Sequence, residues 1–208
     1  MQTTFKPAPL GEKQWKDLQD LDPHSVCRRA VVNFDQQEAC YTITFIGREY
    51  CFFVNEKRVE GPDGENDGLA GDDEFILLIL TYLLSAQEVP LVENWVSEKD
   101  LQGGSLFFKG PHVLPVQPLI QSFGKDPQKF LDLGMTLGGK SVTEYGDASL
   151  KFQALPRIPI TCILWAEDDE FPARVSFLFD PSIESHLPLD VVLALVRSVV
   201  KLLVEIAS

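Results

Sequence analysis

An acidic, glycine-rich loop between residues 61 and 74 has the carboxylate spacing of a calcium-binding loop. Such a loop places oxygen ligands at alternate residues, a glycine at the sharp turn and a bidentate carboxylate at position twelve. Positions one, three, five, six and twelve are occupied here by Asp63, Glu65, Asp67, Gly68 and Glu74. The main-chain carbonyl of Leu69 adds a ligand at position seven. The loop is therefore a candidate calcium site.

Three features depart from the usual calcium loop and leave a second interpretation open. Glu65 stands where aspartate or asparagine is usual, and Ala70 replaces a larger apolar residue. The preceding segment has the pattern of a strand, so the motif is at best half of an EF-hand. The alternative is a solvated acidic loop in a chain whose net charge is −13.

Two histidines and an aspartate form the second candidate site. His112 lies in a Gly-Pro-His segment and His186 opens the segment HLPLD, both at expected junctions between elements. His186 and Asp190 are four residues apart at a helix start, so they can share a face as metal ligands or as an acid–base pair. The alternative is that both only stabilise the N-terminus of that helix. The sequence leaves open whether His112 lies near them.

Three further patterns contain residue types of catalytic or ligand-binding motifs, but a structural role explains each of them better. The residue types of a hydrolase triad occur in Asp180, Ser182, Ser185 and His186. No G-x-S-x-G segment precedes either serine, and a turn that enters a helix explains the same residues. The contiguous acids Glu167–Glu170 are typical of a solvated hairpin tip. The spacing of a Walker phosphate loop is met from Gly134 to Ser141, but a helix precedes it and a strand follows, the reverse of the motif's context.

The composition excludes several classes of protein. The 208 residues are 45% hydrophobic, which is the share of a folded globular chain and rules out a disordered one. Lys and Arg number 18 against 31 Asp and Glu, and a chain with this acidic excess repels phosphate, so we expect no nucleic-acid partner. No apolar run approaches the ~20 residues that span a bilayer, so we expect no membrane insertion.

The cysteines and the N-terminus predict a cytoplasmic protein. No C-x-x-C pair occurs among Cys27, Cys40, Cys51 and Cys162. Zinc-ribbon and ferredoxin-type sites therefore have no support, and no iron–sulfur cluster is expected. The first residues contain no apolar signal core. Because the cytosol is reducing, we expect four free thiols.

Residues 40–54 predict a β-hairpin. Apolar side chains alternate on both sides of Gly47-Arg48, and glycine at the first loop position favours a two-residue type II′ turn. This turn opposes Cys51 to Thr44 and leaves Cys40 too distant for a disulfide. It places the large apolar residues of the two strands on one face, namely Tyr41, Ile43, Phe45, Tyr50, Phe52 and Val54.

The remaining pattern predicts a single α+β domain over residues 1–208, with residues 1–11 loosely ordered. Helices are expected over 12–29 (two short ones), 74–84, 113–123, 127–137 and 188–207. The helix at 74–84 is apolar almost all round, which indicates a buried central helix. A third strand is expected over 57–60, and a second antiparallel region over 149–180. Two hairpin or meander regions thus pack with a central and a C-terminal helix, in one sheet or two.

Several segments, taken in their order, resemble those of a known family. They are FIGREY, VEGPDGE, GGSLFFKGPH, SFGKDPQKFLDLGMTLGG and LPRIPITCILWAEDDEFPARVSFLFD followed by HLPLD. Together they resemble the prokaryotic domain of unknown function 3786 over nearly the whole chain, from Leu21 to the C-terminal helix. This family is uncharacterised, so the resemblance implies no activity. Some relatives come from anaerobes and carry a cysteine-rich segment of iron–sulfur type, which this chain lacks.

Two classes of function remain. The first is a cytosolic binding module for a small ligand, a cofactor or a metal such as calcium. The second is a metal-assisted, hydrolase-like enzyme centred on His112, His186 and Asp190. A cleft that gathers both histidines with Asp190 favours the enzyme, whereas histidines that point apart favour the binding module. We expect the binding module.

Overall fold

The computed structural model describes residues 11–64 and 67–208 and has an α+β fold with two antiparallel sheets. The sheet regions predicted separately are thus two sheets rather than one. Residues 1–10, which we expected to be loosely ordered, lie outside the described residues, as does Glu65 of the candidate calcium loop.

The first sheet has the order β1-β2-β3-β4, with strands Asn33–Asp35, Cys40–Phe45, Arg48–Phe53 and Arg58–Glu60. The second has the order β5-β9-β8-β7-β6, with strands Val96–Ser97, Arg174–Phe179, Ile158–Trp165, Ala148–Leu155 and Lys140–Val142. The central strand β8 is buried on both faces along nearly its whole length. This burial explains why its sequence is apolar at consecutive positions.

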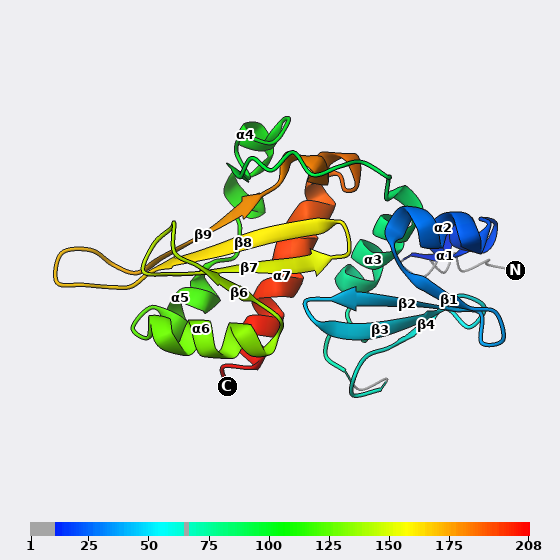
Figure 1. Ribbon diagram of the computed structural model, residues 1–208, viewed down its shortest axis with the longest axis horizontal. Helices are drawn as coiled ribbons and strands as arrows, with labels where there is room; N and C mark the ends of the chain where they lie inside the picture. Colours follow the sequence, from blue (N-terminus) through cyan, green and yellow to red (C-terminus); the bar gives the residue numbers. More distant parts are fainter. Residues whose placement is uncertain (1–10, 65–66) are drawn as a thin grey trace, which may run out of the picture.

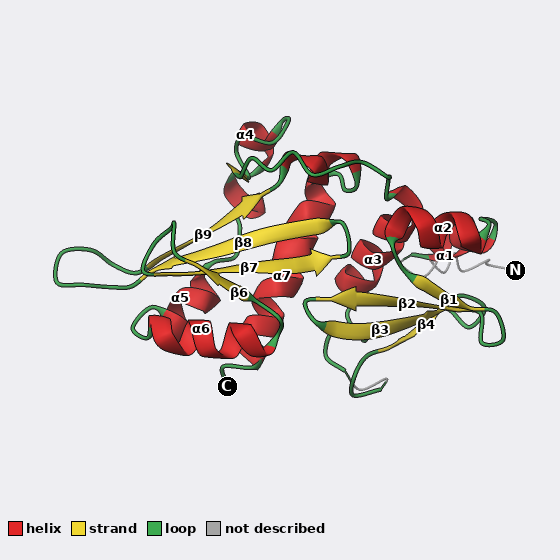
Figure 2. Cartoon of the chain, viewed as in Figure 1, coloured by secondary structure: helices red, strands yellow, loops and turns green. Residues whose placement is uncertain are grey.

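The helices are α1 (Glu12–Gln19), α2 (Pro23–Ala30), α3 (Asp73–Ser85), α4 (Gly104–Phe107), α5 (Gln117–Phe123), α6 (Pro127–Thr136) and α7 (Leu189–Glu205). Two 3₁₀ turns also occur: η1 (Gly110–His112) lies between α4 and α5, and η2 (Pro181–Ser185) lies between β9 and α7. Helices α1–α3 lie beside the first sheet, and α5–α7 lie beside the second (Figures 1 and 2). Packing of α3 against α7 joins the two halves, and one apolar core runs through both.

Helix α3 is the buried central helix that its sequence predicts. Phe75 is fully buried, and its ring lies 5.1 Å from that of Phe45, 4.8 Å from Tyr50 and 6.5 Å from Phe52. The inner face of the first sheet therefore packs on α3 through aromatic contacts. The N-cap of α3 is Asp72.

The register predicted for the β2–β3 hairpin is wrong, because the turn lies one residue earlier in the chain than predicted. The two-residue loop is Ile46-Gly47, and both residues have positive φ, 44° and 70°. This is the geometry of a type I′ turn, which suits the twist of a hairpin better than other turns. Cys51 therefore lies opposite Thr42 rather than Thr44. The buried face is nevertheless as predicted, because the pairing shifts by two positions in total and side chains alternate with period two.

Packing between the two sheets explains the unexpected turn. A positive φ is unfavourable for a β-branched residue such as Ile46. Its side chain is buried, and its N–H donates to the carbonyl of Ala154 in β7 at 3.2 Å. A Cβ on the neighbouring Gly47 would lie 2.7 Å from the carbonyl oxygen of Leu137, so only glycine fits. These contacts form only in the folded chain, so the local turn pattern does not contain them.

The described residues include no helix that is long and apolar enough to cross a bilayer. The acidic segment Glu167–Glu170 forms the connection between β8 and β9, as its composition predicts. In Figure 1 this connection extends from the end of the second sheet.

Candidate functional site

A cleft of about 940 Å³ opens between α3, the first half of α7 and the α4–η1 segment, and we call it the α3–α7 cleft. Its charged and aromatic lining includes Asp73, Glu74, Phe107, His112, Asp190 and Arg197. Its apolar lining includes Leu77, Pro111, Val191 and Ala194. The volume lies within the range of small-molecule sites, roughly 300–1,000 Å³.

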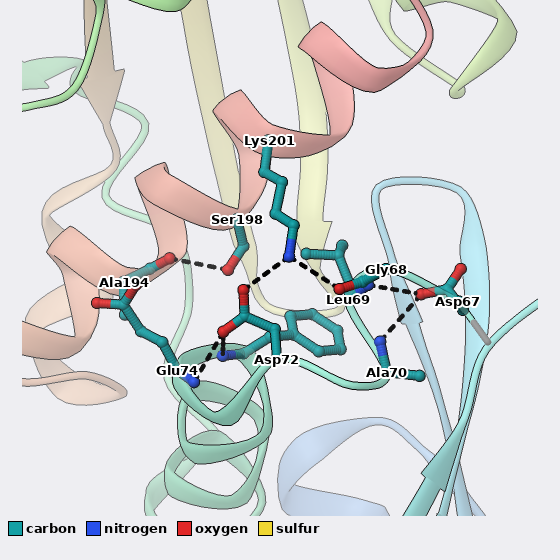
Figure 3. A network of polar contacts seen from close by, with 10 residues as sticks. Asp67, Gly68, Leu69, Ala70, Asp72, Glu74, Ala194, Ser198 and Lys201 are labelled. Carbon is teal, nitrogen blue, oxygen red and sulfur yellow. Dashed lines mark hydrogen bonds and ion pairs between the residues drawn. The ribbon is translucent and has the colours of Figure 1, made fainter. Parts of the chain in front are cut away.

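A lysine of α7 holds the N-terminus of α3 at one end of the cleft (Figure 3). The Lys201 ammonium donates to Asp72 Oδ2 and to the carbonyl of Gly68, both at 2.8 Å. The other oxygen of Asp72 accepts from the N–H groups of Glu74 and Phe75. Burial alone raises the pKa of Asp72, but the bonds from Lys201 and the two N–H groups outweigh it and lower that pKa.

Two carboxylates in the cleft have no side-chain partner within the part of the chain that the structure describes. Arg197 of α7 donates to Glu74 of α3 at 2.6 Å and neutralises it. Asp73 and Asp190, by contrast, take part in no hydrogen bond or ion pair there. Both are exposed. The cleft therefore combines an apolar wall with uncompensated negative charge.

His112 forms an aromatic wall of the same cleft. Its ring stacks on that of Phe107, with centroids 4.6 Å apart and planes at 2°. Two glycines allow the chain to fold back here: Gly103 has φ 81°, and a Cβ on Gly104 would lie 2.0 Å from the carbonyl oxygen of Glu98. His112 thus lines the same cleft as Asp190, which answers the question left open by the sequence.

The model of the family described as domain of unknown function 3786 matches residues 22–202. The chain belongs to this family. The match confirms the resemblance seen in the segments of the sequence, and it includes every cleft residue from Asp73 to Arg197. No curated protein and no solved structure matches the chain.

His186 lies outside the cleft, although it is close to Asp190 in sequence. Its side chain is 1% exposed, and Nδ1 accepts from the N–H of Gln87 at 3.3 Å. Nε2 is buried and has no partner among the described residues. Burial, and then the positive charge of Arg157, lower the pKa of His186 below its ordinary value of 6.5. The three residues proposed for a metal-assisted site are therefore not gathered at one surface.

The buried imidazole predicts a pH-dependent stability. Because the folded protein holds His186 neutral while the unfolded chain protonates it near pH 6.5, acid favours unfolding. Below pH 6.5, the free energy of unfolding should decrease by up to about 1.4 kcal/mol for each pH unit. In urea unfolding between pH 7.5 and 5, His186→Gln should lose this slope, whereas His112→Gln, an exposed control, should keep it. Equal slopes in both variants would contradict the assignment.

The carboxylates of the predicted calcium loop take other partners where the structure describes them. Asp67 is buried, and its Oδ1 accepts from the N–H groups of Leu69 and Ala70 at 2.9 and 3.0 Å. Glu74, at position twelve of the loop, forms an ion pair with Arg197 of α7. Within residues 11–64 and 67–208, no three His, Cys, Asp or Glu side chains are grouped as metal ligands. Calcium binding by this loop stays a prediction.

The segment that contains the residue types of a triad is a structural turn. Asp180 is buried, caps η2 through the N–H of Ser182 at 3.0 Å, and also accepts from the N–H groups of Val92 and Glu93 at 3.0 and 2.7 Å. These bonds lower the pKa of the carboxyl although burial raises it. The carboxylate thus connects β9 to the segment that links α3 with β5.

The other two patterns also have structural roles. In the Walker-like segment, α6 ends at Thr136, and the carbonyl of Gly134 in its last turn accepts from the N–H of Gly139 at 3.0 Å before β6 begins. At the β8–β9 tip, Asp168 Oδ1 accepts from the N–H groups of Glu170 and Phe171 at 2.9 and 2.7 Å. The first is a helix end and the second an Asx turn.

Sequence reasoning missed Arg197 and Phe107 as cleft residues. The spacing of Arg197 and Lys201 predicts a stripe of α7 that faces water. Both residues are exposed, as predicted, and both cations also bind acids at the N-terminus of α3. A signal in the sequence could have indicated this contact. Two cations lie four residues apart on one expected helix, and the contiguous acids Asp72–Glu74 lie at the start of another.

Proposed function

We propose that this protein is a small-ligand-binding module, and that its ligand is an organic cation with an apolar body held in the α3–α7 cleft. The observation that carries the proposal is a pair of carboxylates, Asp73 and Asp190, that have no partner among the described residues and lie beside an apolar wall. The proposal places the protein in the cytosol, where its four free cysteines would persist.

The apolar part of the ligand would lie on the facing sides of the two helices. Leu77 of α3 and Val191 and Ala194 of α7 supply aliphatic surface. The stacked rings of Phe107 and His112 supply a flat surface at the other side. Burial of apolar ligand surface contributes roughly 25 cal/mol per Å², so such walls provide affinity without specific bonds.

The positive part of the ligand would lie near Asp73 and Asp190. The charges of the other two carboxylates are already compensated, because Glu74 binds Arg197 and Asp72 binds Lys201. An ammonium or amidinium group would form charge-assisted hydrogen bonds with the two remaining acids. An anionic ligand would meet repulsion there, and the chain as a whole has a net charge of −13.

The geometry favours binding over metal-assisted catalysis. His112 and Asp190 share the cleft, but His186 faces the N–H of Gln87 in the interior. A catalytic zinc site uses three protein ligands, and the described residues supply no such group. The cleft is therefore better suited to holding a molecule than to activating a metal-bound water.

Two probes of similar shape and opposite charge test the proposal. Tryptamine, an aromatic ammonium ion, should bind with a Kd on the order of 1 mM or tighter in calorimetry, because it supplies both parts of the ligand. Indole-3-acetate should bind at least tenfold more weakly, because its carboxylate faces Asp73 and Asp190. Equal affinity for the two probes, or no binding of tryptamine, would contradict the proposal.

Matched variants then locate the site. The double change Asp73→Asn and Asp190→Asn should weaken tryptamine binding about tenfold, because it removes both free charges and keeps the side-chain shapes. Asp169→Asn, at the exposed β8–β9 tip, removes one charge outside the cleft and should leave the affinity unchanged. A loss of similar size in Asp169→Asn would show that only net charge matters.

A further inference from the structure

A row of chemically active side chains crosses the outer face of the first sheet, away from the α3–α7 cleft. It consists of Asp35 in β1, Cys40 in β2, Cys51 in β3 and Glu60 in β4. Asp35 lies directly opposite Cys40, and Cys51 lies directly opposite Glu60. Because neighbouring residues alternate between faces, this row is opposite the buried face that carries Tyr41 and Phe52.

The two thiols are diagonal neighbours. Cys40 pairs with Phe53, and Thr42 pairs with Cys51. The N–H of Val54 bonds to the carbonyl of Ala39 at 2.9 Å, so Cys40 and Phe53 form a non-hydrogen-bonded pair, and Cys51 lies in the next such pair on the same face. The Cys51 thiol also contacts the Thr42 hydroxyl at 3.8 Å.

The state of the Cys40 thiol fits this placement. Cys40 is buried, whereas Cys51 is half-buried and can be reached from solvent. Burial, and then the charge and hydrogen bond of the Cys51 thiol, raise the pKa of Cys40 to about 12. Both thiols are free in the folded chain. Cys40 is therefore a neutral thiol in the folded chain, and a metal ion that binds it must displace its proton.

The geometry decides between a covalent link and a bound ion. Diagonal residues on paired strands have Cα atoms about 7–8 Å apart, and a disulfide needs about 4.4–6.8 Å. This spacing is too long for a disulfide without movement of the strands, whereas an ion between the two side chains would add the length of two metal–sulfur bonds. A tetrahedral zinc site is also unsuitable, because the described residues offer no group of three ligands.

We propose that Cys40 and Cys51 bind one soft, monovalent metal ion, Cu(I), as a two-thiolate site on this face. Thiolates are the ligands that select Cu(I), and this ion is satisfied by two of them. Asp35, opposite Cys40, adds a negative charge that attracts a cation, whereas Arg58 already compensates the charge of Glu60. The ion enters as Cu(I), so no electron is transferred, and each thiol releases one proton to water.

Competition with a coloured chelator tests the site. The reduced full-length protein is titrated with Cu(I) without oxygen, in the presence of bathocuproine disulfonate, whose Cu(I) complex absorbs visible light. The wild type should withdraw one equivalent of Cu(I) per chain. Cys51→Ser should bind the ion on the order of 100-fold more weakly or worse, because it removes one of two ligands. Cys51 is chosen because it is only half-buried, so its replacement leaves the core intact.

Cys27→Ser is the matched control, since Cys27 is a half-buried free thiol of α2. It should retain the wild-type affinity and stoichiometry. Equal Cu(I) affinity in Cys51→Ser and the wild type would overturn the proposal, and so would loss of the ion in Cys27→Ser. A Cys40–Cys51 disulfide formed in high yield by oxidised glutathione would also overturn it, because the strands would then be close enough to bond. None of these outcomes depends on the α3–α7 cleft.

Discussion

Phe75→Ala should lower the free energy of unfolding by about 3–5 kcal/mol. Phe75 is fully buried, and its ring contacts the rings of Phe45, Tyr50 and Phe52. The change removes apolar burial and leaves a cavity where the first sheet packs on α3, so both terms destabilise the folded state. In a chain of this size the thermal midpoint should fall by roughly 6–20 °C. Urea unfolding followed by circular dichroism measures the same loss at constant temperature.

Phe171→Ala provides the control for this prediction. Phe171 belongs to the β8–β9 tip and is 66% exposed, so the same change of residue removes little buried surface. Its effect should lie within about 0.5 kcal/mol. If the two variants unfolded at the same urea concentration, α3 would not have the central role that the structure gives it.

The hairpin shows which part of the fold the sequence predicts well. Alternation of apolar residues correctly identifies the face that packs on α3, because this pattern has a period of two and tolerates a register shift of two. The turn itself was predicted incorrectly. Gly47 favours a turn that begins with it, but the turn begins at Ile46, which is held by the Ala154 carbonyl of the other sheet. A contact between two residues more than a hundred positions apart leaves no pattern in the sequence around the turn.

The cleft shows the corresponding limit for a functional site. The sequence identified His112 because it lies at a junction between elements, and Asp190 because it follows His186 by four residues at a helix start. His112 and Asp190 both line the cleft, but His186 does not. That spacing describes a regular helix, but His186 precedes α7 and follows the 3₁₀ turn η2. The irregular backbone turns its ring into the interior, where Gln87 binds it.

The cysteine pair has a similar origin. With the turn expected at Gly47-Arg48, Cys51 lies opposite Thr44, and Cys40 is four residues further along the strand. With the turn at Ile46-Gly47, Cys51 lies opposite Thr42, and Cys40 becomes its diagonal neighbour. The burial of Ile46 between the sheets thus brings the two thiols together. Long-range packing determines the proposed ion site, although every residue of that site lies within one hairpin.

The second large effect is expected at Asp180. Asp180→Ala should lower the free energy of unfolding by about 2–4 kcal/mol, because three backbone N–H groups lose the carboxylate that accepts their hydrogen bonds. One of these bonds holds the N–H of Glu93, which has φ 60° and so a backbone conformation that is unfavourable without support. Without Asp180, amide hydrogen exchange should increase at Val92 and Glu93 before it increases in β8.

Asp168→Ala is the matched control, since Asp168 also accepts two backbone hydrogen bonds but is exposed at the β8–β9 tip. Its effect should stay below about 1 kcal/mol, because water replaces the lost partners there. The pKa of Asp180 is lowered in the folded state, so its contribution is present above pH 3.8 and is lost as the pH falls through its folded value. This window lies below that of His186, so acid unfolding should show two steps of destabilisation. Asp180→Ala should reduce only the lower one, to which Asp72 also contributes. Unchanged exchange at Val92 and Glu93 in Asp180→Ala would show that the segment between α3 and β5 is held by other contacts.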